Sequence, residues 1–174
     1  VICTFLVGLI FVNLFKIDKK VGLLLASGTA ICGATAMAAV ASLIKAKPKD
    51  LLICLAIIFI FNAISMIFFP FFGKSIGMSN EIFGAWISMA IHDTSSVIGA
   101  AVAFGGSAVE PAATLKLGRT LWLIPLIITI GFFYKNDSQI KFPVFILLFI
   151  IAIISGTFID FGQSLLFFLN YLSK

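Results

Sequence analysis

A short polar run inside an otherwise apolar stretch, Ser88–Ser96 (SMAIHDTSS), is the first place where this sequence could do chemistry. It contains His92, the only histidine of the chain, followed directly by Asp93. An ionisable side chain at the centre of a membrane helix costs about 2.5–3.5 kcal/mol even on the lenient scale, so it should face a cavity or a partner. Histidine ordinarily titrates near pH 6.5, which suits proton exchange. We predict that His92 and Asp93 couple protons or ions and that His92, Ser95 and Ser96 are substrate ligands. The alternative is a hydrogen-bonded pair that fixes helix packing.

A second candidate is the run of small residues from Ser27 to Ala36 (SGTAICGATA). Gly28, Cys32 and Ala36 recur every four residues, a spacing that lets two membrane helices approach closely. The functional alternative is a discontinuous helix, because broken helices in transporters present backbone N–H groups and a positive dipole end where an anion can bind. In that case four residues would line the break: Thr29, Cys32, Gly33 and Thr35.

The third candidate is the more polar connector that carries Glu110, Lys116 and Arg119. The planar fork of Arg119, the only arginine, suits a bidentate oxyanion. Glu110 is an auxiliary candidate for ion coupling. The simpler interpretation is that Lys116 and Arg119 anchor a helix end at the membrane interface.

The composition limits the class of protein that must position these groups. Of 174 residues, 61% are hydrophobic and 11% are charged, which excludes both an ordinary soluble domain and a disordered chain. The net charge of +5 comes from lysines in loops, without the aromatic residues that accompany nucleic-acid binding. The three cysteines have no zinc-like spacing, and one histidine with one aspartate makes no metal site. We therefore predict no metal, no cofactor, no nucleic acid and no enzymatic activity.

Hydropathy and turn residues divide the chain into about six membrane segments. The pattern lacks strand alternation, so the predicted fold is all-α, a polytopic transmembrane helical bundle forming one membrane domain over 1–174. The chain starts with Val within a short apolar run, so we interpret it as a fragment of a longer protein. The expected membrane segments are 1–14, 21–44 (discontinuous), 51–72, 81–104, 119–134 and 142–159, with 160–174 at the interface.

Two lysine-rich loops, Phe15–Lys20 (FKIDKK) and Lys45–Asp50 (KAKPKD), flank the segment 21–44. If this segment crosses the membrane once, one basic loop lies outside, against the positive-inside tendency. If it is a re-entrant hairpin, both loops lie on the same side. Charge alone leaves both topologies open.

Three motifs resemble the YeiH-like family of bacterial inner-membrane proteins, a conserved-hypothetical group that carries the label of proposed sulfate exporters. Its S/A-I-C-G-A-x-A run is matched at Ala30–Ala36, its I/V-H-[DE]-x-x-Q-V-x-x-A run at Ile91–Ala100, and its K-L-x-R run at Lys116–Arg119. One departure is Ser96, which stands where the family usually has glutamine.

The resemblance implies an inverted-repeat transporter fold of about ten helices, similar to bile-acid symporters and sodium/proton antiporters. The six segments here would be the third to the eighth. The segment 21–44 would be a broken helix that crosses the membrane once, with its symmetry mate beyond Lys174.

These observations favour a secondary transporter of a small anion, sulfate or another sulfur oxyanion, in the bacterial inner membrane as a multi-pass protein. A cation antiporter on the same scaffold, with Asp93 as ion ligand, is the first alternative. A membrane protein without transport activity is the second. The expected partners are the anion and the lipid bilayer, and a homo-oligomer is left open.

Overall fold

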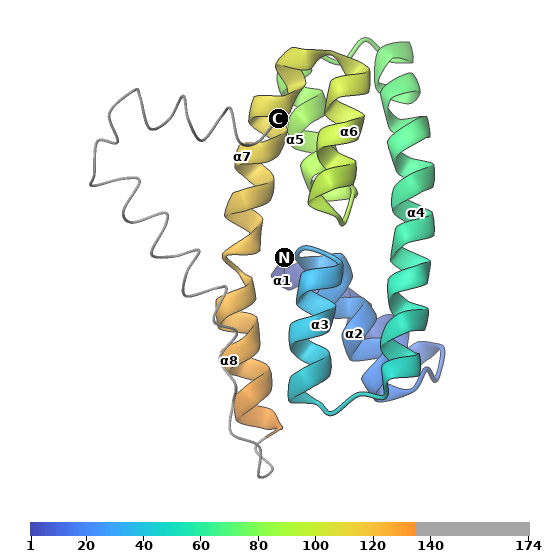
Figure 1. Ribbon diagram of the computed structural model, residues 1–174, viewed down its shortest axis with the longest axis vertical. Helices are drawn as coiled ribbons and strands as arrows, with labels where there is room; N and C mark the ends of the chain where they lie inside the picture. The colour runs from blue at the N-terminus through green and yellow to red at the C-terminus, as the bar shows by residue number, and fades with distance from the viewer. Residues whose placement is uncertain (135–174) are drawn as a thin grey trace, which may run out of the picture. The chain divides into compact units, whose positions relative to one another are not determined.

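Two long helices form the frame of the structure, a computed structural model that describes residues 1–134; within these residues the regular structure is entirely helical. They are α4 (Pro48–Ser75) and a run in which η1 (Gly106–Ala108), α7 (Val109–Thr120) and α8 (Leu123–Phe133) follow one another (Figure 1). Each extends over 28 residues and is apolar enough to cross a membrane. A helix of that length rises about 42 Å, which exceeds the roughly 30 Å of a bilayer's hydrocarbon core.

The first hairpin consists of α2 (Lys19–Ala30) and α3 (Ala34–Leu43), which pack side by side and run in opposite directions (Figure 1). The connection Ile31–Gly33 forms its tip. At the other end the Nζ of Lys20 donates a hydrogen bond of 3.0 Å to the carbonyl of Lys45. The two ends of this hairpin therefore lie together.

The segment 21–44 is therefore a helical hairpin, and the expectation of a single broken crossing helix is wrong. Gly33 has a φ of +63°, a conformation that glycine adopts easily, and its N–H bonds the carbonyl of Gly28 at 2.9 Å. This tight turn reverses the chain. Both lysine-rich loops consequently lie at the same end, which removes the charge conflict noted in the sequence.

The second hairpin consists of α5 (Asn80–Ala90) and α6 (Thr94–Phe104), with Ile91–Asp93 at its tip. Its two ends also lie together, because a Cβ built on Gly105 would be 2.9 Å from the Oδ1 of Asn80. The segment 81–104, expected as one membrane-length helix, is therefore two antiparallel helices. Chain reversal occurs at Ile91–Asp93, where α5 ends and Asp93 caps the start of α6.

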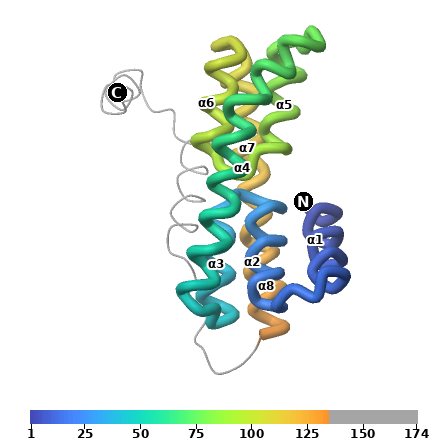
Figure 2. The backbone as a smooth tube through the Cα atoms, turned by 90° about the vertical axis from the view of Figure 1, so that its right-hand side faces the viewer, coloured from blue at the N-terminus to red at the C-terminus, as the bar shows by residue number. Residues whose placement is uncertain are grey.

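The two hairpins approach each other from opposite ends of α4 (Figures 1 and 2). The first connects to the start of α4 and the second to its end, each through a short loop. Each hairpin has its own apolar core, one around Leu24 and Met37 and the other around Phe83 and Ile87. The tips are thus left between two separately packed halves.

The remaining described helix, α1 (Ile2–Leu14), packs against α2 on the side away from α4 (Figure 2). Large apolar side chains are exposed along α1 and α4; Phe71, for example, is 77% exposed. Such surfaces are expected on helices that face lipid or further membrane helices. The expected segments 142–159 and 160–174 lie outside the described residues.

The hairpin topology predicts the membrane side of four loop positions. In the full-length protein, Lys20→Cys and Lys45→Cys should react with a membrane-impermeant maleimide from one side, whereas Ser79→Cys and Gly106→Cys should react from the other. The background and control is the Cys3→Ser protein, because Cys3 is exposed whereas Cys32 and Cys54 are buried. Labelling of Lys20→Cys and Lys45→Cys from opposite sides would contradict the hairpin.

Candidate functional site

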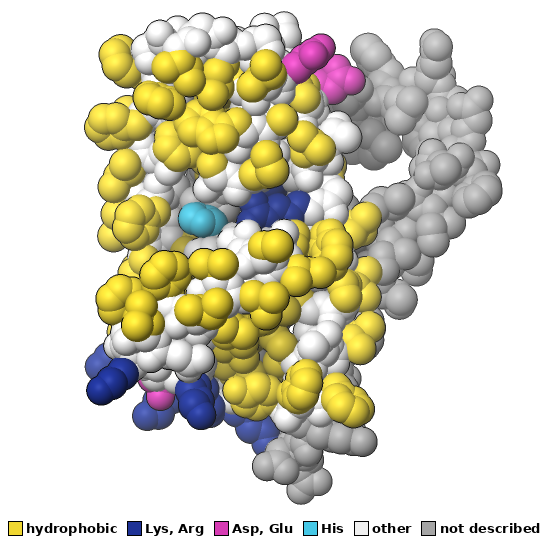
Figure 3. Space-filling model, turned by 180° about the vertical axis from the view of Figure 1, so that it is seen from behind, with side chains coloured by type: hydrophobic (Ala, Val, Ile, Leu, Met, Phe, Trp, Pro, Cys, Tyr) yellow, Lys and Arg dark blue, Asp and Glu magenta, His cyan; other side chains and the backbone are white. Residues whose placement is uncertain are grey.

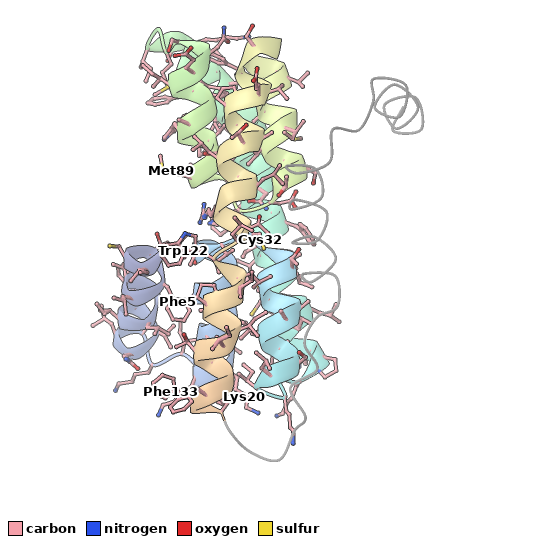
Figure 4. All side chains as sticks on the ribbon, turned by 90° about the vertical axis from the view of Figure 1, so that its left-hand side faces the viewer. Phe5, Lys20, Cys32, Met89, Trp122 and Phe133 are labelled. Carbon is pink, nitrogen blue, oxygen red and sulfur yellow. The ribbon has the colours of Figure 1, made fainter. Side chains whose placement is uncertain are left out.

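The tips of the two hairpins meet beside the middle of α4. A Cβ built on Gly33 would lie 3.6 Å from both the carbonyl carbon and the oxygen of His92, so the two tips are in contact. Figure 4 shows Cys32 at this end of the first hairpin, far from Lys20, with Met89 close to the end of α5. We call the residues Ile31–Gly33 and Ile91–Asp93 together the tip junction.

The tip junction is reached from one face of the molecule. Figure 3 shows the histidine side chain beside basic side chains in a recess of an otherwise apolar surface, whereas the remaining basic side chains on this face gather at one end. A cavity of about 430 Å³ also opens next to Arg119, between α1, the end of α5 and α7; its lining includes Ser88, Thr114 and Trp122. Solute can therefore approach these polar groups within a largely apolar protein.

Arg119 joins the two hairpins through the carbonyl ends of their first helices. Its Nε donates to the carbonyl of Ala30 at 2.8 Å and its Nη2 to that of Thr29, both at the end of α2. Its Nη1 donates to the carbonyls of Ser88 at 3.3 Å and Met89 at 2.8 Å, near the end of α5. A helix C-terminus carries roughly half a negative charge, so two of them together balance the single positive charge of the guanidinium. The expectation of Arg119 as a bidentate ligand is replaced by this double cap.

Lys116, one turn earlier on α7, is fully buried. Its Nζ donates a hydrogen bond of 2.7 Å to the carbonyl of Ile91 in the second tip. The interpretation of Lys116 and Arg119 as interfacial anchors is therefore wrong, because Lys116 binds the second tip and Arg119 binds the helix ends next to both tips. A buried ammonium group is costly unless it is paired, and here the carbonyl of Ile91 accepts its hydrogen bond.

Asp93 closes the N-terminus of α6. Its Oδ2 accepts hydrogen bonds from the backbone N–H of Ser96 at 3.0 Å, from the hydroxyl of Ser96 at 3.1 Å and from the hydroxyl of Ser95. Ser95 and Ser96, predicted as substrate ligands, thus point their hydroxyls at Asp93. The positive end of α6 is already neutralised by this carboxylate.

The N-terminus of α3 lacks such a cap. Its N-cap residue is Gly33, which has no side chain to hydrogen-bond the start of this helix. The Cys32 thiol is buried next to the Thr35 hydroxyl and the Ala36 N–H, while Thr35 itself is exposed. The Thr29 hydroxyl is not free to bind an anion, because it donates to carbonyls within its own helix. Of the four residues predicted to line the break, Cys32 and Gly33 lie in the first tip.

Asn62 is a site residue that the sequence analysis missed. It lies in the middle of α4, is 1% exposed, and its Oδ1 accepts a 3.1 Å hydrogen bond from the backbone N–H of His92. The Nδ1 of His92 lies 3.2 Å from the same oxygen. The sequence signal that could have identified Asn62 is its side-chain amide, which lies within the uncharged apolar segment 51–72. Polar groups inside membrane helices usually have a function.

Glu110 does not join the site. It is exposed in the first turn of α7, nine residues before Arg119, which corresponds to about 13 Å along a helix. Among residues 1–134, no group of three or more His, Cys, Asp or Glu side chains could hold a metal ion. The acidic pair expected for ion coupling is therefore not assembled in the described part.

The long apolar helices and the polar junction between them define an α-helical membrane protein. The chain belongs to the family described as conserved hypothetical protein 698, whose model matches residues 1–174. The resemblance inferred from the three motifs is confirmed.

Relatives from bacteria bear the name UPF0324 membrane protein. The chain is 44% identical over 161 residues to one from Bacteroides thetaiotaomicron, covering 91% of this chain and 49% of the relative. It is 41% identical over 163 residues to one from Photobacterium profundum, covering 93% and 50%. The chain thus spans about half the length of the curated relatives it matches. No solved structure matches it.

The double cap predicts that Arg119→Gln destabilises the protein strongly. Glutamine cannot replace four charge-assisted hydrogen bonds, each worth about 1.5–3 kcal/mol, so the thermal unfolding temperature of the full-length protein in detergent should fall markedly. Arg119→Lys should recover only part of the loss, because an ammonium lacks the planar fork. Lys74→Gln is the matched control, since Lys74 donates to a single exposed carbonyl. Equal unfolding temperatures for Arg119→Gln and Lys74→Gln would refute the double cap.

Two substitutions at Asp93 distinguish the contribution of its N-cap hydrogen bonds to α6 from the contribution of its negative charge. Asp93→Asn should keep the ligand-free stability nearly unchanged, because asparagine is as good an N-cap as aspartate. Asp93→Ala should lose about 1 kcal/mol. Both are measured by thermal unfolding of the full-length protein. If Asp93→Asn is as unstable as Asp93→Ala, the carboxylate charge itself, rather than the cap, supports the fold.

Proposed function

We propose that this protein is a secondary transporter of a small anion, with a sulfur oxyanion such as sulfate as the first candidate. The observation that carries the proposal is the meeting of two hairpins from opposite ends at one polar junction beside two long apolar helices. Discontinuous helices whose ends meet near the middle of the bilayer are the usual binding sites of secondary transporters.

The charges at the tip junction favour an anion over a cation. Lys116 binds the second tip, Arg119 binds the helix ends beside both tips, and the start of α3 adds the positive end of a helix dipole. Asp93 is the one carboxylate among the tip residues, and α6 already uses it. A cation antiporter would need more oxygen ligands than Asp93 supplies, and Glu110 lies too far away to help.

The order hairpin, then long helix occurs twice, in residues 19–75 and again in 80–133. The first pair starts at one end of α4 and the second at the other, which supports an inverted repeat within this chain. The symmetry mate of the first hairpin would then be the second one, not a segment beyond Lys174. Alternating access would follow if each hairpin opened towards its own side of the membrane.

The distribution of lysines supports a multi-pass protein of the bacterial inner membrane. The loops at the open end of the first hairpin carry Lys16, Lys19, Lys20, Lys45, Lys47 and Lys49. Positive charge of this density in short loops favours the cytoplasmic side. His92, which lies between Asn62 and the first tip, is the residue that we expect to carry a coupled proton.

Anion binding should stabilise the full-length protein against heat. An anion at about 100 times its dissociation constant adds about 2.7 kcal/mol, so the unfolding temperature should rise with sulfate, sulfite or thiosulfate but not with sodium. Lys116→Met, which keeps most of the unbranched side chain but removes the ammonium group and its charge, should abolish the rise. In liposomes, the wild-type protein should show counterflow of labelled sulfate, and Lys116→Met should show none.

Lys74→Gln is the matched control for that experiment, because it removes a lysine at the end of α4 away from the tips. It should retain both the thermal shift and the flux. A shift with sodium alone would favour the cation antiporter. The absence of any shift and any flux with all the anions would refute transport of a sulfur oxyanion.

A further inference from the structure

Only one end of the side-chain amide of Asn62 has a hydrogen-bond partner among the described residues. Its Oδ1 accepts the backbone N–H of His92 at 3.1 Å, and because an N–H can only donate, this contact fixes which end of the amide is the oxygen. The opposite end, Nδ2, is buried and has no hydrogen-bond partner among the described residues. A buried NH₂ group without a partner carries an uncompensated desolvation cost, which a ligand would remove.

This amide lies beside the open start of α3. A Cβ built on Gly33, the N-cap residue of that helix, would lie 3.6 Å from His92 and 3.6 Å from Ile58, and Ile58 precedes Asn62 by one turn on the same face of α4. The two features are independent, since one is a backbone end and the other a side chain on a different helix. Both offer hydrogen-bond donors.

We propose that the Nδ2 of Asn62 donates to one oxygen of an oxyanion whose other oxygens bind the backbone N–H groups at the start of α3. Asn62 would then be the residue that selects a polyatomic oxyanion over a monatomic halide, because the two donor groups demand two acceptor atoms. The Lys116 ammonium, bound to Ile91 in the neighbouring tip, supplies positive charge nearby. This inference rests on the anion transport proposed above and identifies the ligand class of that same site.

Asn62→Asp tests the assignment with the smallest change. The variant keeps an oxygen for the His92 N–H and exchanges only the NH₂ group for a second oxygen, which repels an anion. In the full-length protein, we expect the dissociation constant of sulfate, measured by thermal shift and calorimetry, to rise at least about tenfold, as for loss of a hydrogen bond to a charged group. Chloride should compete with sulfate better than it does in the wild type.

Asn13→Asp is the matched control, because it makes the same chemical change at an exposed position in α1. It should bind sulfate like the wild type. If Asn62→Asp does not fold, Asn62→Ser retains a hydroxyl acceptor near His92 without the amide, and the same weakening of sulfate binding is expected.

The outcomes separate this inference from the proposed function. Sulfate binding that is lost in the Asn62 variants but kept in Asn13→Asp supports the inference. Sulfate binding or flux that is equal in wild type and Asn62→Asp overturns the assignment of Asn62 and leaves transport standing. A wild-type protein that binds none of sulfate, sulfite and thiosulfate overturns both, as does a sodium site strengthened by Asn62→Asp.

Discussion

The structure depends on satisfying the backbone of helices that end inside the protein. A helix that stops within a membrane leaves several carbonyls without partners, in surroundings where no water can compensate them. Here α2 and α5 both end in the middle of the bundle, and one guanidinium binds the last carbonyls of both. Arg119 lies about 90 residues from the first of these carbonyls and 30 from the second, so it holds together segments that are distant in sequence.

The two tips are alike in shape and different in charge. At α6 the chain provides its own anion, the Asp93 carboxylate, and occupies the helix start. At α3 the corresponding residue is Gly33, which provides nothing but a bare backbone. On the proposal of an anion transporter, the start of α3 is the helix end left for an external anion. Asn62 bonds the second tip through its Oδ1.

Most of the helical structure could be predicted from the sequence, and so could the regions of the site. The apolar runs, the glycine-rich break near Cys32 and the polar break at His92 and Asp93 are local features, and each coincides with a helix end in the structure. The family followed from the same motifs. These features are readable because helix propensity, chain breaks and membrane cost depend on residues within a few positions of one another.

The direction of the chain after each break was decided only by the tertiary structure. A broken crossing helix and a re-entrant hairpin have the same local sequence, and the bond from Lys20 to the carbonyl of Lys45 separates them. The roles of Arg119, Lys116 and Asn62 were hidden for the same reason, since their partners are 25 to 90 residues away. The sequence by itself determined which segments are helical and indicated a break near Cys32, because these depend on neighbouring residues. The packing of the two hairpins against α4 and α7 decided that the segment 81–104 reverses at Ile91–Asp93 and which side chains satisfy the helix ends.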